Sequence, residues 1–146
     1  PTSLGGLAAH ERDDVGARLA RLAIRDQATQ LLGVALDDEI VPNVSNYTLA
    51  RAFGMPIVEP VLRSVPAMLS APAPLRGNVR EGRATTGMLQ FDVVGDGMGG
   101  TETADHGNVG ASDVGADAWL DFLTTHWDAP PARIRDPYVA IGLPHG

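Results

Sequence analysis

The chain has 146 residues, which is enough for one domain of ordinary size and too few for two hydrophobic cores. Its 18 acidic residues outnumber 11 basic residues, all arginines, so the net charge is −7 and we expect neither nucleic acid nor an anionic membrane surface as a partner. The absence of cysteine excludes disulfides and thiolate nucleophiles, and no apolar run approaches the ~20 residues of a membrane span.

The first third of the chain predicts a helix, a strand and a second helix. Residues 13–23 place apolar side chains at helical spacing. Residues 29–36 form a continuous apolar run, which is typical of a strand covered on both faces in a parallel sheet. Three acidic residues, 37–39, end this run. A second amphipathic helix is predicted over 44–53, with Gly54 as its C-terminal cap.

The middle of the chain predicts a connection followed by another strand. Prolines are frequent over 55–85, so we expect an irregular connection with one short strand near Ile57 and Val58. Residues 85–94 are rich in β-forming side chains and are predicted as the next strand. A glycine-rich loop is expected over 95–110.

The last helix is predicted over 113–127, with Ser112 as its N-terminal cap. We expect its apolar stripe to pack against the sheet, and the tail that follows to be extended. The stripe consists of Ala116, Trp119, Leu120, Leu123 and Trp127.

Alternation of strands and helices predicts an α/β fold with parallel strands, in one unit that spans 1–146. The carboxyl ends of such strands lie at one edge of the sheet, where catalytic groups collect. Asp37 and Asp38 follow one predicted strand, and His106 lies in the loop after the next. A carboxylate there would accept the ring N–H of His106 and fix its tautomer, which is the acid and base half of a nucleophile triad. The spacing leaves both aspartates open as the acid.

A family resemblance narrows this choice. Residues 31–54, with the pattern D-x-x-V-P-N at 38–43, resemble the segment around the seventh strand of α/β-hydrolase esterases and lipases. Residues 88–91, followed by His-Gly-Asn at 106–108 and a closing helix, resemble their eighth strand, histidine loop and last helix. The similarity is greatest to bacterial extracellular lipase-like proteins of that fold and covers 26–137.

The resemblance implies that the chain is the C-terminal portion of a mostly parallel α/β-hydrolase sheet with flanking helices. It makes Asp38 the triad acid and His106 the general base, acting on a carboxylic ester without a cofactor or metal. The chain lacks the G-x-S-x-G turn that carries the nucleophile in this family. We therefore expect a fragment that is inactive alone, completed by an upstream part of the same polypeptide or by a partner chain. Its composition suits an exported bacterial protein.

Two other functions stay open at this point. The chain could be a non-catalytic assembly or binding subunit in which Asp38 and His106 never meet. Asp96 and the Ala-Asp-His-Gly segment at 104–107 are also similar to metal motifs of alkaline-phosphatase-type enzymes, although these lie much farther apart in that superfamily. The simplest interpretations are an exposed acidic turn at 37–39 and structural or exposed roles for His10, His126 and His145.

Overall fold

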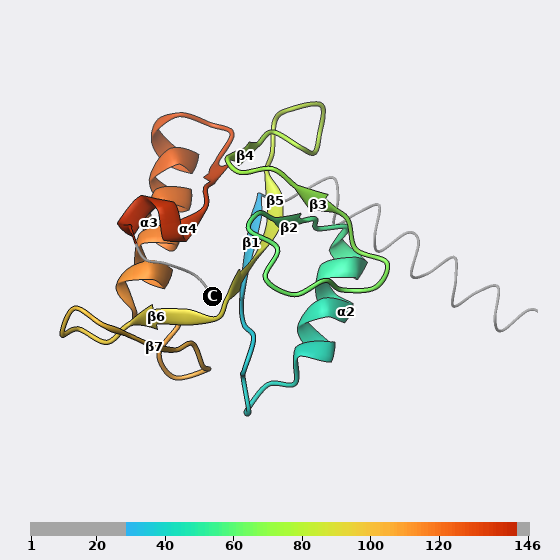
Figure 1. Ribbon diagram of the computed structural model, residues 1–146. Coiled ribbons are helices and arrows are strands. Elements are labelled where there is room, and N and C mark those ends of the chain that lie inside the picture. The colour runs from blue at the N-terminus through green and yellow to red at the C-terminus, as the bar shows by residue number, and fades with distance from the viewer. Residues whose placement is uncertain (1–28, 143–146) are drawn as a thin grey trace, which may run out of the picture.

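The computed structural model describes residues 29–142, in which a small parallel sheet lies between helices (Figure 1). The sheet has the strand order β1-β5-β2-β3, and all its pairings are parallel. Its strands are β1 (Gln30–Ala35), β5 (Thr86–Phe91), β2 (Ile57–Val58) and β3 (Ser70–Ala71). The predicted α/β class with a mostly parallel sheet is therefore confirmed. The helix predicted over 13–23 lies outside the described residues.

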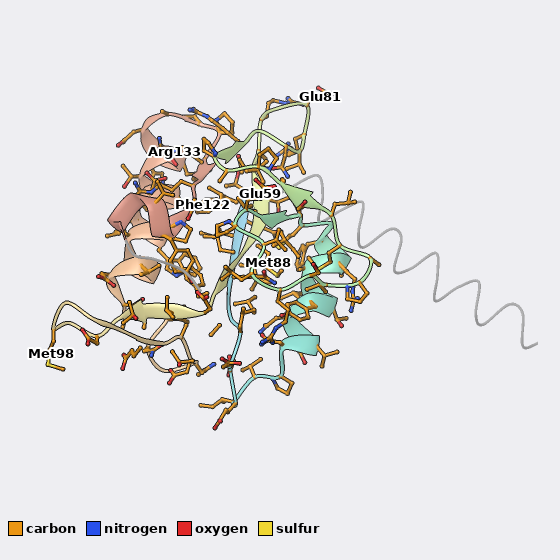
Figure 2. The ribbon with its side chains drawn as sticks, in the orientation of Figure 1. Glu59, Glu81, Met88, Met98, Phe122 and Arg133 are labelled. Atoms are coloured by element: carbon orange, nitrogen blue, oxygen red, sulfur yellow. The ribbon has the colours of Figure 1, made fainter. Side chains whose placement is uncertain are left out.

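The two faces of the sheet are covered by different helices. Alternate side chains of a strand point to opposite faces, so Met88 packs beneath α2 (Asn43–Phe53), whereas Leu89 packs beneath α3 (Asp113–Asp128). Figure 2 shows Met88 and Phe122 on these opposite sides of the sheet. Gly54 ends α2 in the left-handed conformation, with φ of 66°, as predicted.

The connection over 55–85 contains more regular structure than the single short strand that the sequence predicts. Besides β2, it forms β3 and β4 (Leu75–Arg76), and β3 extends the sheet. Strands of two residues leave almost no periodicity in a sequence, which explains why the pattern missed two of the three.

The strand predicted over 85–94 is broken at Asp92. Beyond it, β6 (Val93–Gly95) turns back and pairs antiparallel with β7 (Thr101–Thr103), so the predicted glycine-rich loop begins with a hairpin. The tail is not extended throughout. After β8 (Arg133–Ile134), which pairs with β4, it forms α4 (Pro137–Ile141), because Asp136 accepts N–H bonds at the N-terminus of that helix.

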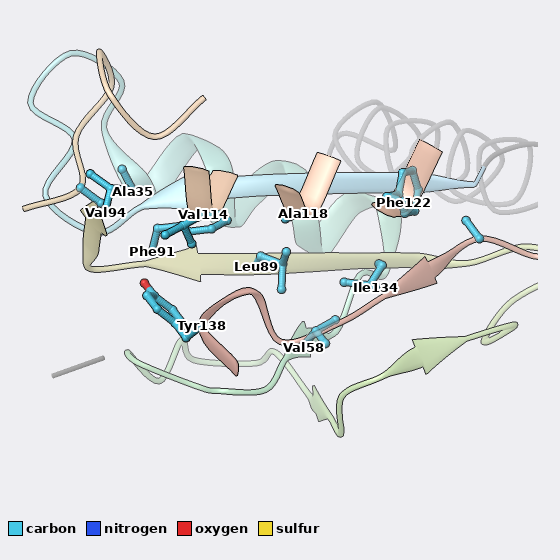
Figure 3. Packing of buried hydrophobic residues seen from close by; sticks show 12 residues of the cluster. Ala35, Val58, Leu89, Phe91, Val94, Val114, Ala118, Phe122, Ile134 and Tyr138 are labelled. Carbon is cyan, nitrogen blue, oxygen red and sulfur yellow. The ribbon is translucent and has the colours of Figure 1, made fainter. Parts of the chain in front are cut away.

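The prediction for the buried face of α3 is wrong. The residues that pack against the sheet are Val114, Ala118 and Phe122 (Figure 3), whereas Trp119 is 42% exposed and Trp127 is 72% exposed. The opposite flank of α3 forms ion pairs, from Asp121 to Arg133 and from Asp117 to Arg135, that join the helix to the tail. The larger apolar flank of α3 is therefore left on the surface of the described structure. No helix within residues 29–142 has the length and apolar character needed to cross a membrane.

Tyr138 joins the tail to the end of β5. Its ring is buried against Phe91, and its hydroxyl donates to Asp92 Oδ1 at 2.7 Å and accepts the Asp92 N–H at 2.9 Å. Burial, together with the bond to Asp92, raises the pKa of Tyr138. The phenol is therefore a neutral donor that fixes the point where β5 gives way to the hairpin.

We expect Tyr138→Phe to lower the free energy of unfolding by about 1–3 kcal/mol, because polar atoms of Asp92 lose a partner. Tyr47→Phe is the matched control, because the buried Tyr47 hydroxyl has no hydrogen-bond partner in the described structure. It should change stability by less than about 0.5 kcal/mol or increase it. Urea unfolding of both variants measures the difference, and equal effects would contradict the assigned role of Tyr138.

Candidate active site

The acidic loop after β1 turns Asp38 inward and Asp37 outward. Asp38 Oδ1 accepts the backbone N–H groups of Ile40 at 2.9 Å and Val41 at 2.8 Å, so the loop closes around its own carboxylate. The Asp38 side chain is 7% exposed, whereas that of Asp37 is 63% exposed and faces Arg63 at 3.7 Å. Of the two aspartates left open by the sequence, Asp38 is thus the one held in place by the fold.

Hydrogen bonds lower the pKa of Asp38. The largest contribution comes from the Val41 N–H, with smaller ones from the ring of His106 and the Ile40 N–H, and they outweigh the opposing effect of burial. Asp38 is therefore ionised at neutral pH. An ionised carboxylate only accepts hydrogen bonds, which determines the proton on any ring nitrogen that it contacts.

The histidine loop is shaped by two side chains that flank His106. Asp105 Oδ1 accepts the N–H groups of Gly107 at 2.7 Å and Asn108 at 2.9 Å, while Asn108 Oδ1 accepts the Asp105 N–H at 2.8 Å. The Asn108 amide also donates to the carbonyl of Thr103 at the end of β7. These reciprocal bonds fix the backbone on both sides of His106.

The two loops bring Asp38 and His106 together across 68 residues of sequence. His106 Nδ1 lies 3.1 Å from Asp38 Oδ2. Since the carboxylate can only accept, Nδ1 carries the proton in this contact, and Nε2 is left as the position for proton transfer. The imidazole is 48% exposed and borders a cleft of about 470 Å³. The other residues that line the cleft are Asp37, Glu39, Ile40, Thr103, Asp105 and Gly107.

Ser112 acts as the predicted helix cap. Its hydroxyl oxygen accepts the N–H of Gly115 at 3.1 Å and donates to the carbonyl of Val109 at 3.0 Å. These bonds fix Ser112 at the start of α3.

The metal-binding alternative finds no ligand cluster in the described part of the chain. No three carboxylate or imidazole side chains of residues 29–142 gather as metal ligands would. Asp96 instead accepts the N–H groups of Met98 and Gly100 within the tip of the β6–β7 hairpin, and these bonds lower its pKa. His126 lies exposed on α3, and His10 and His145 lie outside the described residues.

Sequence reasoning missed three residues around the acid loop. Asn43, Arg63 and Gln90 all make hydrogen bonds that bear on the backbone before Asp38, directly or through a neighbouring loop. The available signal was Gln90, whose amide side chain lies between apolar neighbours in the strand, because a buried amide needs hydrogen-bond partners. Nothing in the sequence shows which loop supplies them.

Comparison with known proteins identifies no relative: no family model, curated protein or solved structure matches the chain. The functional argument therefore rests on the arrangement of the residues themselves, above all on the contact between Asp38 and His106.

The lowered pKa of Asp38 predicts how stability depends on pH. The folded chain binds this proton more weakly than the unfolded chain does, so the stabilisation is complete above the ordinary carboxyl pKa of about 3.9. It disappears as the pH falls through the lower folded value. We expect the stability gap between wild type and Asp38→Asn in urea unfolding to shrink from about pH 6 to about pH 2.5. A gap that stays constant over this range would contradict the assignment.

Proposed function

We propose that this chain is the C-terminal part of an α/β-hydrolase that cleaves carboxylic esters, and that it supplies the acid and the histidine of a serine, histidine and aspartate triad. The observation that carries the proposal is the 3.1 Å contact between Asp38 and His106. It joins the loop after β1 to the loop system after β5, and these two strands are parallel neighbours. The expected order of acid before histidine is also present.

In this proposal His106 moves one proton in each direction. Its Nε2 accepts the proton of a serine hydroxyl as the serine oxygen bonds to the ester carbonyl carbon, and it returns that proton to the alkoxide when the carbon–oxygen bond breaks. Asp38 keeps the proton on Nδ1 and stabilises the imidazolium that forms between these steps. Water then repeats the sequence to release the acid. The serine and the donors for the oxyanion come from outside this chain.

A surface beside this site supports the proposal that another segment completes the fold. β1 is an edge strand, and among residues 29–142 no strand pairs with its outer edge. Trp119, Leu123 and Trp127 form the exposed apolar flank of α3, which packs on the same sheet. Unpaired edges of parallel sheets and large exposed apolar patches are normally covered. An upstream part of the same polypeptide, or a separate partner chain, would add a strand to β1 and apolar side chains to this flank.

The same surface favours a second candidate function, that of a non-catalytic assembly or binding subunit. In that case a foreign subunit covers β1 and α3, and the contact between Asp38 and His106 is only structural. The two functions differ in one respect, because only the hydrolase requires a reactive serine beside His106.

Fluorophosphonate labelling of the natural full-length protein tests the proposal, because this reagent bonds to serines activated by a histidine. We expect one labelled serine within a G-x-S-x-G turn encoded upstream of residue 1. Labelling should be lost in His106→Ala and reduced in Asp38→Asn. A full-length protein without such a turn, or equal labelling in all three proteins, would exclude the ester hydrolase.

A further inference from the structure

The Leu36 carbonyl, two residues before Asp38, accepts hydrogen bonds from two side chains. Asn43 Nδ2 donates to it at 2.9 Å, and an Arg63 guanidinium nitrogen donates to it at 3.1 Å. Asn43 also donates to the Ala35 carbonyl at 3.0 Å. The carbonyls of Ala35, the last residue of β1, and of Leu36, the next residue, are therefore held by side chains from two other segments, just before the chain reaches Asp38.

Asn43 lies in the first turn of α2 but does not cap that helix. Pro42 occupies the cap position without a side-chain bond to the helix, although an asparagine or serine there would ordinarily supply one. The Asn43 amide instead turns back to β1. Its arrangement serves the acid loop and not the N-terminus of the helix.

Gln90 connects a third loop to the same place. Its side chain is buried in β5, where its Oε1 accepts the N–H groups of Leu62 and Arg63, both at 3.0 Å. Its Nε2 donates to the Arg63 carbonyl at 2.8 Å. These three bonds fix the backbone at Leu62 and Arg63, from where the Arg63 guanidinium group reaches both the Leu36 carbonyl and Asp37.

We propose that Asn43, Arg63 and Gln90 are positioning residues for the triad acid: they set the direction in which Asp38 presents its carboxylate to His106. Asp38 Oδ1 is already bound by its own loop, so the direction of Oδ2 depends on how that loop leaves β1. Displacement of a catalytic group by about 1 Å can lower a rate about 10²-fold, which makes this anchoring significant. The catalytic consequence rests on the proposed function, whereas the geometric consequence does not.

Substitution of two uncharged residues distinguishes an effect on the position of Asp38 from an effect on the charges around it. Asn43→Ala and Gln90→Met leave the charges of Asp37, Glu39, Asp105, Arg63 and His106 around the acid loop unchanged. Asn46→Ala is the matched control for Asn43. Asn46 lies one turn later in α2 and makes no bond to β1; its amide donates at 3.4 Å to Asn43 Oδ1, and not to the Asn43 Nδ2 group that binds β1. Arg63→Lys retains the charge and tests the guanidinium contact alone.

Nuclear magnetic resonance on this chain provides the readout. The carboxyl carbon of Asp38 is followed against pH, and the Nδ1 proton of His106 is observed directly. In Asn43→Ala and Gln90→Met we expect the pKa of Asp38 to rise toward its ordinary value and the Nδ1 proton signal to weaken. Asn46→Ala should resemble the wild type. In the full-length esterase, Asn43→Ala should lower kcat by up to about 10²-fold with little change in KM.

The outcomes that overturn the two proposals are distinct. If Asn43→Ala only lowers the urea midpoint, while the Asp38 titration and the His106 proton signal stay as in the wild type, the residues are structural and the positioning proposal is wrong. This result remains decisive if Gln90→Met fails to fold. If the full-length protein has no reactive serine, the proposed esterase is wrong even where the Asp38 titration moves as expected.

Discussion

In the proposed ester hydrolase, His106→Ala in the full-length protein should lower the kcat by roughly 10⁴–10⁶-fold, which is the range for loss of a triad base. In this mechanism His106 Nε2 receives the serine proton, and Asp38 stabilises the resulting positive charge through Nδ1. The alanine variant lacks both functions. Asp38→Asn should cost roughly 10⁴-fold, because an amide in place of the carboxylate allows the wrong tautomer. Steady-state hydrolysis of a nitrophenyl ester measures both losses.

The control for this result is His126→Ala. His126 is an exposed residue in the last turn of α3, so its removal should leave turnover within about twofold of the wild type. Loss of turnover in both histidine variants would indicate general damage to the folded structure, and not a specific role of the His106 imidazole. Unchanged turnover in His106→Ala would remove the histidine from the mechanism.

Gly115→Ala should lower the free energy of unfolding by about 3 kcal/mol or more. A Cβ at this position would lie 1.7 Å from the carbonyl oxygen of Val109, which belongs to the rigid backbone at the end of the histidine loop. Either the first turn of α3 or the end of that loop must move. We therefore expect the contact between Asp38 and His106 to be lost together with stability.

Gly110→Ala is the matched control, because a Cβ at Gly110 has no neighbour within 4 Å. It should change the free energy of unfolding by less than about 0.5 kcal/mol. Urea unfolding at neutral pH compares the two variants, and the Nδ1 proton signal of His106 shows whether the loop has moved. Equal stability of Gly110→Ala and Gly115→Ala would contradict the close packing of α3 on the histidine loop.

The elements that the sequence predicts well are those with a strong local pattern. β1 follows from its apolar run, and α2 follows from its periodicity and the glycine that ends it. For α3 the periodicity predicts a helix but selects the wrong face, because Trp119 and Trp127 are larger than the Ala118 that is buried. Periodicity locates apolar side chains, whereas the tertiary fold decides which of them are covered.

In the candidate site, too, some residues can be predicted from the sequence and others cannot. Asp38 and His106 can be predicted because each follows a strand, and the ends of parallel strands meet. Arg63 and Gln90 could not be predicted, since their roles depend on a loop that crosses from β2 to the end of β1 through contacts between distant segments. Asparagine is common at the start of helices, so the sequence does not distinguish Asn43 from an ordinary helix-starting residue. The three-dimensional structure shows that its amide donates back to the end of β1 and to Leu36.

Within residues 29–142 the outer edge of β1 is unpaired and the tryptophans on α3 are exposed, and both features favour self-association of the chain at high concentration. A second copy of the chain presents the same strand edge and the same apolar side chains, so two copies can associate through these surfaces. The net charge of −7 opposes such encounters through mutual repulsion. Salt weakens this repulsion, because the Debye length falls from about 30 Å at 0.01 M to about 3 Å at 1 M. Solubility of the isolated chain should therefore decline as ionic strength rises.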